Sequence, residues 1–416
     1  MKVCIGPVQL VDRIIFSDIT QENPGMGGSE HYFLYLAHRL SLLRKDISVT
    51  VLFKGPAPSL QGYENAKLNF TPLTAVNSLE NWDIAILGSG FLVHEANLIS
   101  LPARFIVVSH HPHDGNLEQL LINKKPHAVV SLGRYQYLSN SSRGVNHFRI
   151  PSFYLGGGRL QKDDGPKDPK LIGHISSLHP SKGFHVIAKK WRKVVRKNSG
   201  VKLEVLGGAS LYGQHENHPL LPTTQAYGDR LTRLLGSDLQ NGTVRFLGRV
   251  PGSIDSIVKR WSVAVINPSG IGEADPATLR DLIRLGVPVV SSRKYGLSEY
   301  MDYFPETTVK NARSIPSTVN RLLDSHELQL KLIDRSRDLA ASLLERNKVI
   351  ENAWDELLFL KGSELLAREG LNLASLQPEP PELSERLTLF RNDLHARAYR
   401  FLEGIYTKTK SVFIKP

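Results

Sequence analysis

Short apolar runs rich in β-branched residues alternate with segments of helical periodicity along the first 150 residues. The runs predict strands at residues 3–6, 48–53, 83–87, 105–109 and 128–131. Between the first two runs, apolar residues at helical spacing predict a helix that begins near Ser29 and buries one stripe: Phe33, Leu36, Ala37 and Leu40. Strands that alternate with helices in this way are typical of a parallel sheet.

A second set of strands follows a break in this pattern. Residues 155–169 (LGGGRLQKDDGPKDP) combine Gly, Pro and charge without periodicity, which is typical of a linker. The later runs predict strands at residues 171–175, 203–206, 244–247, 263–266 and 287–291. We therefore expect an α/β fold with two Rossmann-like domains, residues 1–160 and 168–340. Because ligand-facing loops follow the carboxyl ends of parallel strands, the site should lie in a central cleft between them.

The C-terminal segment, residues 341–416, is expected to be a helical extension that becomes basic and amphipathic from about residue 384. From Ser384 to Pro416, seven Lys or Arg stand against three Asp or Glu. The apolar positions share one helical face: Leu387, Phe390, Leu394, Phe401 and Ile405. Such a helix either docks on the protein or meets an anionic membrane surface, and the sequence leaves both alternatives open.

Composition narrows the class of protein. Hydrophobic residues make up 41% of the chain and charged residues 22%, which is typical of a folded globular protein. The single Cys4 excludes an intramolecular disulfide and a cysteine metal cluster, and it fits a reducing, cytoplasmic compartment. Since no apolar window reaches the length of a bilayer span, any membrane contact should be peripheral, at the inner face.

The net charge of +12 favours anionic partners, among them nucleotide phosphates, lipid headgroups and nucleic acid. The basic run from Lys189 to Lys193 lies in a helical pattern, where such a run is usually a solvated face. We therefore do not expect nucleic acid as a partner.

A glycine-rich loop precedes the first helix and ends in Gly27-Gly28-Ser29-Glu30. Glycines at a helix start let a phosphate approach free backbone N–H groups, although a flexible loop with a helix cap is the alternative. A dinucleotide fingerprint is rejected, because its third glycine would fall at Glu30 and the glycines do not directly follow the strand.

Three histidines follow the strand expected at residues 105–109, in the run from His110 to Asp114. Adjacent side chains point apart and no cysteine is near, so we predict no metal site there. Hydrogen bonding of His110 to a substrate hydroxyl is favoured over histidines satisfied within the loop, and His111 takes this role if the register shifts by one.

The second domain carries two further motifs. Gly173-His174 leads towards Ser181-Lys182-Gly183, where Lys182 can donate to phosphate oxygens or belong to a solvated turn. After a buried strand, Glu273 and Asp281 stand eight residues apart across the start of a helix. Two carboxylates can accept hydrogen bonds from hydroxyl-rich parts of one ligand. The alternative is a capped helix with a surface acid.

The order of these motifs along residues 1–354 resembles family 4 glycosyltransferases, a group with the GT-B architecture. Phe246-Leu247-Gly248, Pro268-Ser269 and Gly286-Val287-Pro288 add to the resemblance. It implies retaining sugar transfer from a UDP- or GDP-sugar to a hydroxyl of a glycan or lipid-linked acceptor, without an obligatory metal or a further cofactor. Carried over by position, it implies these roles: Gly27 and Gly28 at the donor phosphates, Lys182 on the diphosphate, Glu273 on the sugar, Asp281 on the ribose, His174 near phosphate, His110 beside the reacting carbon, and Ala277 and Thr278 at the donor-side helix start.

This chain departs from the family pattern at three places. Asp281 replaces the usual glutamate, and His174 stands where the family favours arginine. The family's Glu-Gly-Phe-Gly becomes Glu273-Ala274-Asp275-Pro276, so one backbone N–H is lost and Asp275 becomes a candidate for selecting the sugar. A GT-B epimerase or phosphorylase, and a catalytically silent nucleotide-sugar-binding protein, remain alternatives.

Overall fold

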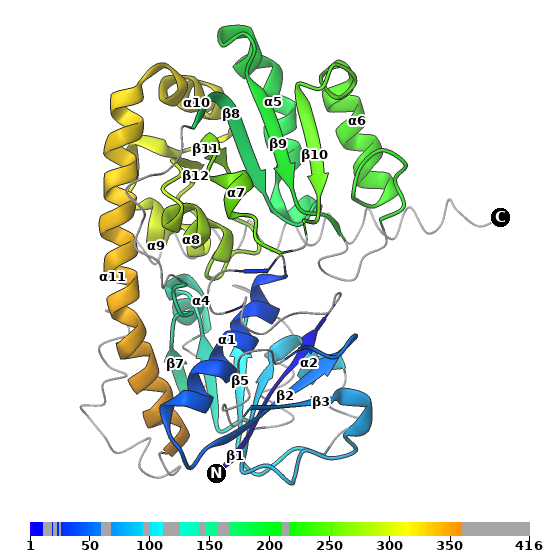
Figure 1. The fold of residues 1–416 in the computed structure, drawn as a ribbon, viewed down its shortest axis with the longest axis vertical. Helices are drawn as coiled ribbons and strands as arrows, with labels where there is room; N and C mark the ends of the chain where they lie inside the picture. The colour runs from blue at the N-terminus through cyan, green and yellow to red at the C-terminus, as the bar shows by residue number, and fades with distance from the viewer. Residues whose placement is uncertain are drawn as a thin grey trace, which may run out of the picture.

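The computed structural model describes residues 1–10, 19, 23–24, 26–59, 68–94, 100–110, 125–140, 146–155, 167–209, 216–250 and 252–359. His111, most of the expected linker and the amphipathic segment from residue 384 lie outside the described residues. Two α/β domains are stacked end to end, and one long helix runs along both (Figure 1). Within the described part of the chain, no helix combines the length and apolar character needed to cross a membrane.

The N-terminal domain is a seven-stranded, all-parallel sheet in the order β3-β2-β1-β4-β5-β6-β7. Its strands are β1 (Lys2–Gln9), β2 (Ser48–Lys54), β3 (Leu68–Pro72), β4 (Ile84–Gly88), β5 (Phe105–Ser109), β6 (Ala128–Ser131) and β7 (His147–Arg149). Its helices include α1 (Gly28–Leu43), α2 (Ser89–His94) and α4 (Arg134–Asn140). The sequence did not predict β3 and β7, because these strands form the two edges and carry few buried apolar residues.

The C-terminal domain is a six-stranded, all-parallel sheet in the order β10-β9-β8-β11-β12-β13. Its strands are β8 (Asp168–Ile175), β9 (Lys202–Leu206), β10 (Val244–Gly248), β11 (Trp261–Val265), β12 (Val289–Ser292) and β13 (Thr308–Val309). Its helices include α5 (Phe184–Lys197), α6 (Gln225–Gln240), α7 (Asp255–Val258), α8 (Ala277–Arg284), α9 (Ser298–Met301), α10 (Ile315–Asp324) and α11 (His326–Phe359). The two-residue edge strand β13 is too short to leave a sequence pattern.

Both sheets have a point at which the strand order reverses. It lies between β1 and β4 in the first domain and between β8 and β11 in the second. Loops diverge to opposite faces at such a switch point and leave a crevice beyond the carboxyl ends of the strands. The fold therefore provides one ligand-facing crevice in each domain.

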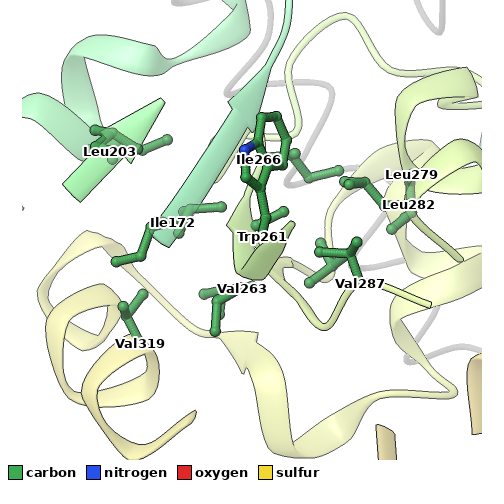
Figure 2. Packing of buried hydrophobic residues seen from close by; sticks show 14 of the residues in the cluster. Ile172, Leu203, Trp261, Val263, Ile266, Leu279, Leu282, Val287 and Val319 are labelled. Carbon is green, nitrogen blue, oxygen red and sulfur yellow. The ribbon is translucent and has the colours of Figure 1, made fainter. Parts of the chain in front are cut away.

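Gly173 in β8 is required by the packing of the C-terminal core. A Cβ atom at this position would lie 1.8 Å from the indole ring of Trp261. Figure 2 shows Trp261 in the middle of the cluster, between Ile172 on one side and Leu279 with Leu282 on the other. The indole Nε1 donates to Glu204 at 2.9 Å, which satisfies the polar atom of this buried ring.

Helix α11 packs against the cores of both domains (Figure 1). Its first half contributes Leu332, Leu339 and Leu343 to the C-terminal core. Its second half contributes Ile350, Ala353, Trp354, Leu357 and Leu358 to the N-terminal core, where it also covers α1. The domain boundary expected at residue 340 therefore falls inside one continuous helix, and α1 is buried on more faces than its predicted stripe.

A second connection between the domains is the segment of residues 150–155. Phe153 and Leu155 belong to the N-terminal core, whereas the intervening Tyr154 belongs to the C-terminal core. The side chain of Asn347 on α11 accepts from Tyr154 N and donates to Tyr154 O, both at 2.8 Å. Asn347 thus holds the backbone of the chain at the point where it passes from one domain to the other.

Replacing Trp354 by alanine should lower the free energy of unfolding by about 3 to 5 kcal/mol, because this side chain is fully buried where α11 joins the N-terminal core. Urea denaturation followed by tryptophan fluorescence and circular dichroism measures the loss. Leu330→Ala, on the same helix but 48% exposed, is the control and should change it by about 0.5 kcal/mol or less. Equal effects in the two variants would contradict the packing of α11.

Candidate active site

A cavity of about 680 Å³ lies between the two domains. Its walls come from the loop before α1 and the end of β5 on one side, and from the loops after β8, β9, β10 and β11 on the other. All the residues that the sequence analysis assigned to the site, except His174, line it: Gly27, Gly28, His110, Lys182, Glu273, Ala277, Thr278 and Asp281.

Two helices begin at this cavity, and their first residues lie close together. A Cβ atom added to Gly28, the first residue of α1, would lie 3.3 Å from the Cβ atom of Ala277, the first residue of α8. The first-turn N–H groups of a helix have no intrahelical acceptor, and the helix dipole adds partial positive charge there. Two such ends at one place make a favourable position for an anion.

Glu30 lies in the first turn of α1 and lines the same end of the cavity. Its Oε2 atom is buried and has no hydrogen-bond partner. Burial raises the pKa of this carboxyl group, which favours its neutral form. A neutral carboxyl group removes the repulsion that a carboxylate would exert on an anion bound at the two helix ends.

Lys182 and Glu273 form an ion pair in the cavity wall. Lys182 Nζ donates to Glu273 Oε1 at 2.9 Å, and Asn267 Nδ2 donates to the same oxygen at 2.7 Å. Lys182 lies on a short 3-10 turn before α5, and Gly183 follows it with a φ of 72°, in the left-handed region that favours glycine. The charged pair is therefore held by two loops that follow the neighbouring strands β8 and β11.

Asn267 organises the turn that carries Glu273. Its Nδ2 also donates to Ile271 O at 3.1 Å, and its Oδ1 accepts from Ser269 Oγ at 2.7 Å. Gly270 lies in the left-handed region, with a φ of 71°. The sequence analysis gave Asn267 no role. The signal was present, because an amide directly after a buried strand can satisfy the backbone of the next turn.

His110 follows β5 and is oriented by aromatic residues of α1. Its ring centroid lies 5.0 Å from that of Phe33 and 5.4 Å from that of Tyr32, both in edge-on geometry. The imidazole therefore stands at the cavity wall beside the start of α1. Among the described residues, no group of His, Cys, Asp or Glu has the arrangement of a metal site.

His174 does not line the cavity, which corrects the expectation of a phosphate contact. Its side chain is fully buried, with Nδ1 2.6 Å from Val265 O and Nε2 2.7 Å from Ser176 Oγ. Burial lowers its pKa to about 4, and the hydrogen bond to Val265 partly offsets this. A neutral imidazole at this position ties β8 to β11 instead of binding an anion.

Asp281 and Asp275 differ in what their carboxylates can do. Asp281 lines the cavity one turn before Arg284, whose Nε lies 3.8 Å from Asp281 Oδ1. The Asp275 side chain is only 4% exposed, and it accepts from Tyr300 OH at 2.6 Å and from Ser152 N at 3.1 Å. These partners differ from the sugar hydroxyl that the sequence analysis considered for Asp275.

Residues 160–339 match the sequence profile of the family described as glycosyl transferases group 1. These residues form a glycosyl transferases group 1 domain, and the chain has the GT-B fold. No curated protein matches it in sequence.

Solved glycosyltransferases share this architecture at low sequence identity. Anabaena HepE, solved with UDP and glucose, is 15% identical, with a TM-score of 0.58 over 86% of this chain and 99% of HepE. Sucrose-phosphate synthase from Thermosynechococcus elongatus is 13% identical, with a TM-score of 0.57 over 88% and 99%. S. aureus TarM, solved with Fondaparinux, alpha-GlcNAc-glycerol and UDP, is 17% identical, with a TM-score of 0.50 over 65% of this chain. The chain spans 55% of the length of TarM.

The structure has two ion pairs that sequence reasoning missed. Arg149 of the N-terminal domain bonds Glu299 of the C-terminal domain, which also accepts from the backbone N–H of Arg134. Within the C-terminal domain, Arg280 approaches Asp275 to 3.7 Å. Arg149 and Glu299 are 150 residues apart in the sequence, and Asp275 and Arg280 do not have the spacing of an ion pair on one helical face. Only the meeting of the domains brings Arg149 to Glu299.

Acidification should destabilise the protein partly through His174. The unfolded chain takes up a proton at this histidine near pH 6.5, whereas the folded chain takes it up only near pH 4, so stability falls as the pH drops through this window. Unfolding free energies of the native protein and of His174→Gln are compared by urea denaturation from pH 7 to 4.5. The native protein should lose about 2 to 3 kcal/mol more than the variant. Parallel pH curves would refute the buried neutral imidazole.

Proposed function

We propose that this glycosyltransferase moves a sugar from a UDP- or GDP-sugar to a hydroxyl of a glycan or lipid-linked acceptor, with retention at the anomeric carbon. One observation carries the proposal: the N-termini of α1 and α8 meet at the cavity that also holds the Lys182–Glu273 pair. This arrangement has one part suited to a diphosphate and one part suited to sugar hydroxyls.

The diphosphate takes the positive part of the cavity. Backbone N–H groups at Gly28, Ala277 and Thr278 can donate to its oxygens, and Lys182 adds a full positive charge. Pro276 has no N–H, so donation on the α8 side begins at Ala277. These groups are in place before the reaction and stabilise the diphosphate as it departs.

The sugar takes the acidic part. When Lys182 turns towards the diphosphate, Glu273 is released from its ion pair and can accept hydrogen bonds from sugar hydroxyls, while Asn267 keeps the carboxylate in place. His110 stands on the opposite wall, where an imidazole can contact a hydroxyl near the anomeric carbon. Asp281 is assigned to the ribose hydroxyls.

The reaction proposed here breaks the bond between the anomeric carbon and the donor phosphate oxygen. The acceptor oxygen bonds to the same face of that carbon, and its proton passes to the departing phosphate oxygen. The acceptor approaches from the N-terminal domain, whose Asn23, His110 and Ser152 give its side of the cavity polar groups. A role in polysaccharide biosynthesis agrees with a glycan acceptor.

Lys182→Ala should weaken binding of a nucleoside diphosphate by about 10- to 150-fold and leave binding of the nucleoside unchanged, because a charge-assisted phosphate contact contributes about 1.5 to 3 kcal/mol. Isothermal titration with UDP, GDP, uridine and guanosine measures both. Lys170→Ala is the control, since Lys170 lies on β8 but donates to Ser199 O at the surface. Equal losses for diphosphate and nucleoside would remove Lys182 from the diphosphate.

Glu273→Gln should lower kcat by about 100-fold or more, whereas Asp281→Asn should mainly raise the donor KM by about tenfold. The first residue contacts the reacting sugar, and the second contacts the ribose. Radiolabelled transfer from a donor panel gives both constants, and the anomeric configuration of the product tests retention. Unchanged turnover in Glu273→Gln would exclude the assigned role.

The same assays separate the alternatives. Conversion of the donor without a new glycosidic bond would favour an epimerase, and release of a sugar phosphate would favour a phosphorylase. Tight donor binding without turnover on any acceptor would favour a catalytically silent binding protein.

A further inference from the structure

We propose that Asp275 and Arg280 are positioning residues that fasten the loop carrying Glu273 to the segment of residues 150–155, so that the donor-side acid reaches its working position only when the two domains are docked. In the sequence, both residues lie between the two acids of the site, Glu273 and Asp281. Sequence analysis considered Asp275 for the sugar, but the contacts of both side chains run to the interdomain segment.

The contacts form one continuous polar cluster across the domain boundary. Asp275 accepts from Ser152 N at 3.1 Å, and Arg280 Nη1 donates to Phe153 O at 2.8 Å. Two consecutive residues of the interdomain segment are therefore held by a carboxylate and a guanidinium group. The two charged groups also lie 3.7 Å from each other, which supplies each with an opposite charge in a buried environment.

The cluster is largely buried, although Asp275 and Arg280 also line the cavity. Side-chain exposure is 4% for Asp275 and 12% for Arg280, and Tyr300 OH donates to the second Asp275 oxygen at 2.6 Å. Tyr154, the next residue of the segment, is fixed by Asn347 on α11. The loop is thus tied to the one stretch of chain that contributes side chains to both domain cores.

An independent contact holds the other side of this loop against the N-terminal domain. Gly133, which precedes α4, lies so close to the loop that an added Cβ atom would be 2.0 Å from Ala274 O. From the C-terminal domain, Gly296 N donates to Glu273 O at 3.0 Å. The backbone of residues 273–275 is consequently enclosed by both domains, and a change in domain docking must move it.

The chemistry of this chain at these positions agrees with that role. Where the family pattern has Glu-Gly-Phe-Gly, this chain has a buried carboxylate at 275 with its guanidinium partner at 280. A charged pair needs both partners and fixed geometry to remain stable when buried, so it favours one docking position over neighbouring ones. Catalytic groups lose rate steeply when they shift by about 1 Å.

The test compares Asp275→Asn, the double variant Asp275→Asn with Arg280→Met, and the control Glu306→Gln. The double variant removes the hydrogen bond to Phe153 O without leaving an unpaired buried charge, which keeps the test valid if Asp275→Asn does not fold. Glu306 forms a two-pronged ion pair with Arg335 inside the C-terminal domain, at 2.7 and 3.0 Å, away from the cavity. It controls for the general loss of a carboxylate.

Each variant is assayed well below its melting temperature for kcat and donor KM. We expect kcat to fall by about 10- to 100-fold in both Asp275 variants while the donor KM changes much less, and Glu306→Gln to keep the native kcat although its melting temperature falls. If the Asp275 variants melt earlier but keep native kcat, or if the double variant regains the kcat lost in the single one, the pair is only structural and the proposal is wrong.

The kinetic measurement rests on the proposed transferase function. A second measurement does not depend on that function. Hydrogen–deuterium exchange of the ligand-free protein should show faster uptake in residues 150–155 and 271–281 together in both Asp275 variants, and in neither segment in Glu306→Gln. Faster uptake in only one segment would overturn the coupling. If no donor is turned over by the native protein, the proposed function fails while this measurement still decides the positioning role.

Discussion

The docking of the two domains is the constraint on which the site depends. Neither crevice is a complete site by itself, because the first supplies a helix start and an imidazole while the second supplies the lysine and both acids. Helix α11 buries side chains in both cores, and the segment of residues 150–155 alternates between them. These two connections set the relative position of the half-sites, so that Gly28 and Ala277 come into near contact.

Electrostatics divides the resulting cavity into two parts. The starts of α1 and α8, together with Lys182, form a positive end, and the buried Glu30 is shifted towards its neutral form beside it. Glu273 forms the acidic part and, without a ligand, takes Lys182 as its counter-ion. In the donor binding proposed above, the diphosphate replaces Glu273 as the partner of Lys182, and neutral sugar hydroxyls donate to Glu273, so that both side chains keep polar partners.

The departures of this chain from the family pattern have different structural meanings. His174 is a core residue that links β8 to β11, and its low pKa follows from burial. Asp275 faces the interdomain segment, with Arg280 as its charged neighbour. Asp281 keeps its place on the cavity wall. These three departures thus lie in the core, at the domain contact and on the cavity wall, and only the surroundings of each side chain distinguish them.

The sequence by itself determined the two parallel sheets, the strands with buried apolar runs, the helix starting near Ser29 and the set of motifs around the cavity. These features have local causes, since hydrophobic periodicity and glycine-rich turns act within a few residues. The edge strands β3 and β7 escaped prediction because they carry few buried apolar residues, and β13 because it has only two residues. Tertiary structure alone decided that α11 packs into both domain cores, that His174 turns inward, and that Ser152 and Phe153 meet Asp275 and Arg280. Each of these depends on groups more than 90 residues apart or on the burial of a whole helix, and no local pattern encodes either.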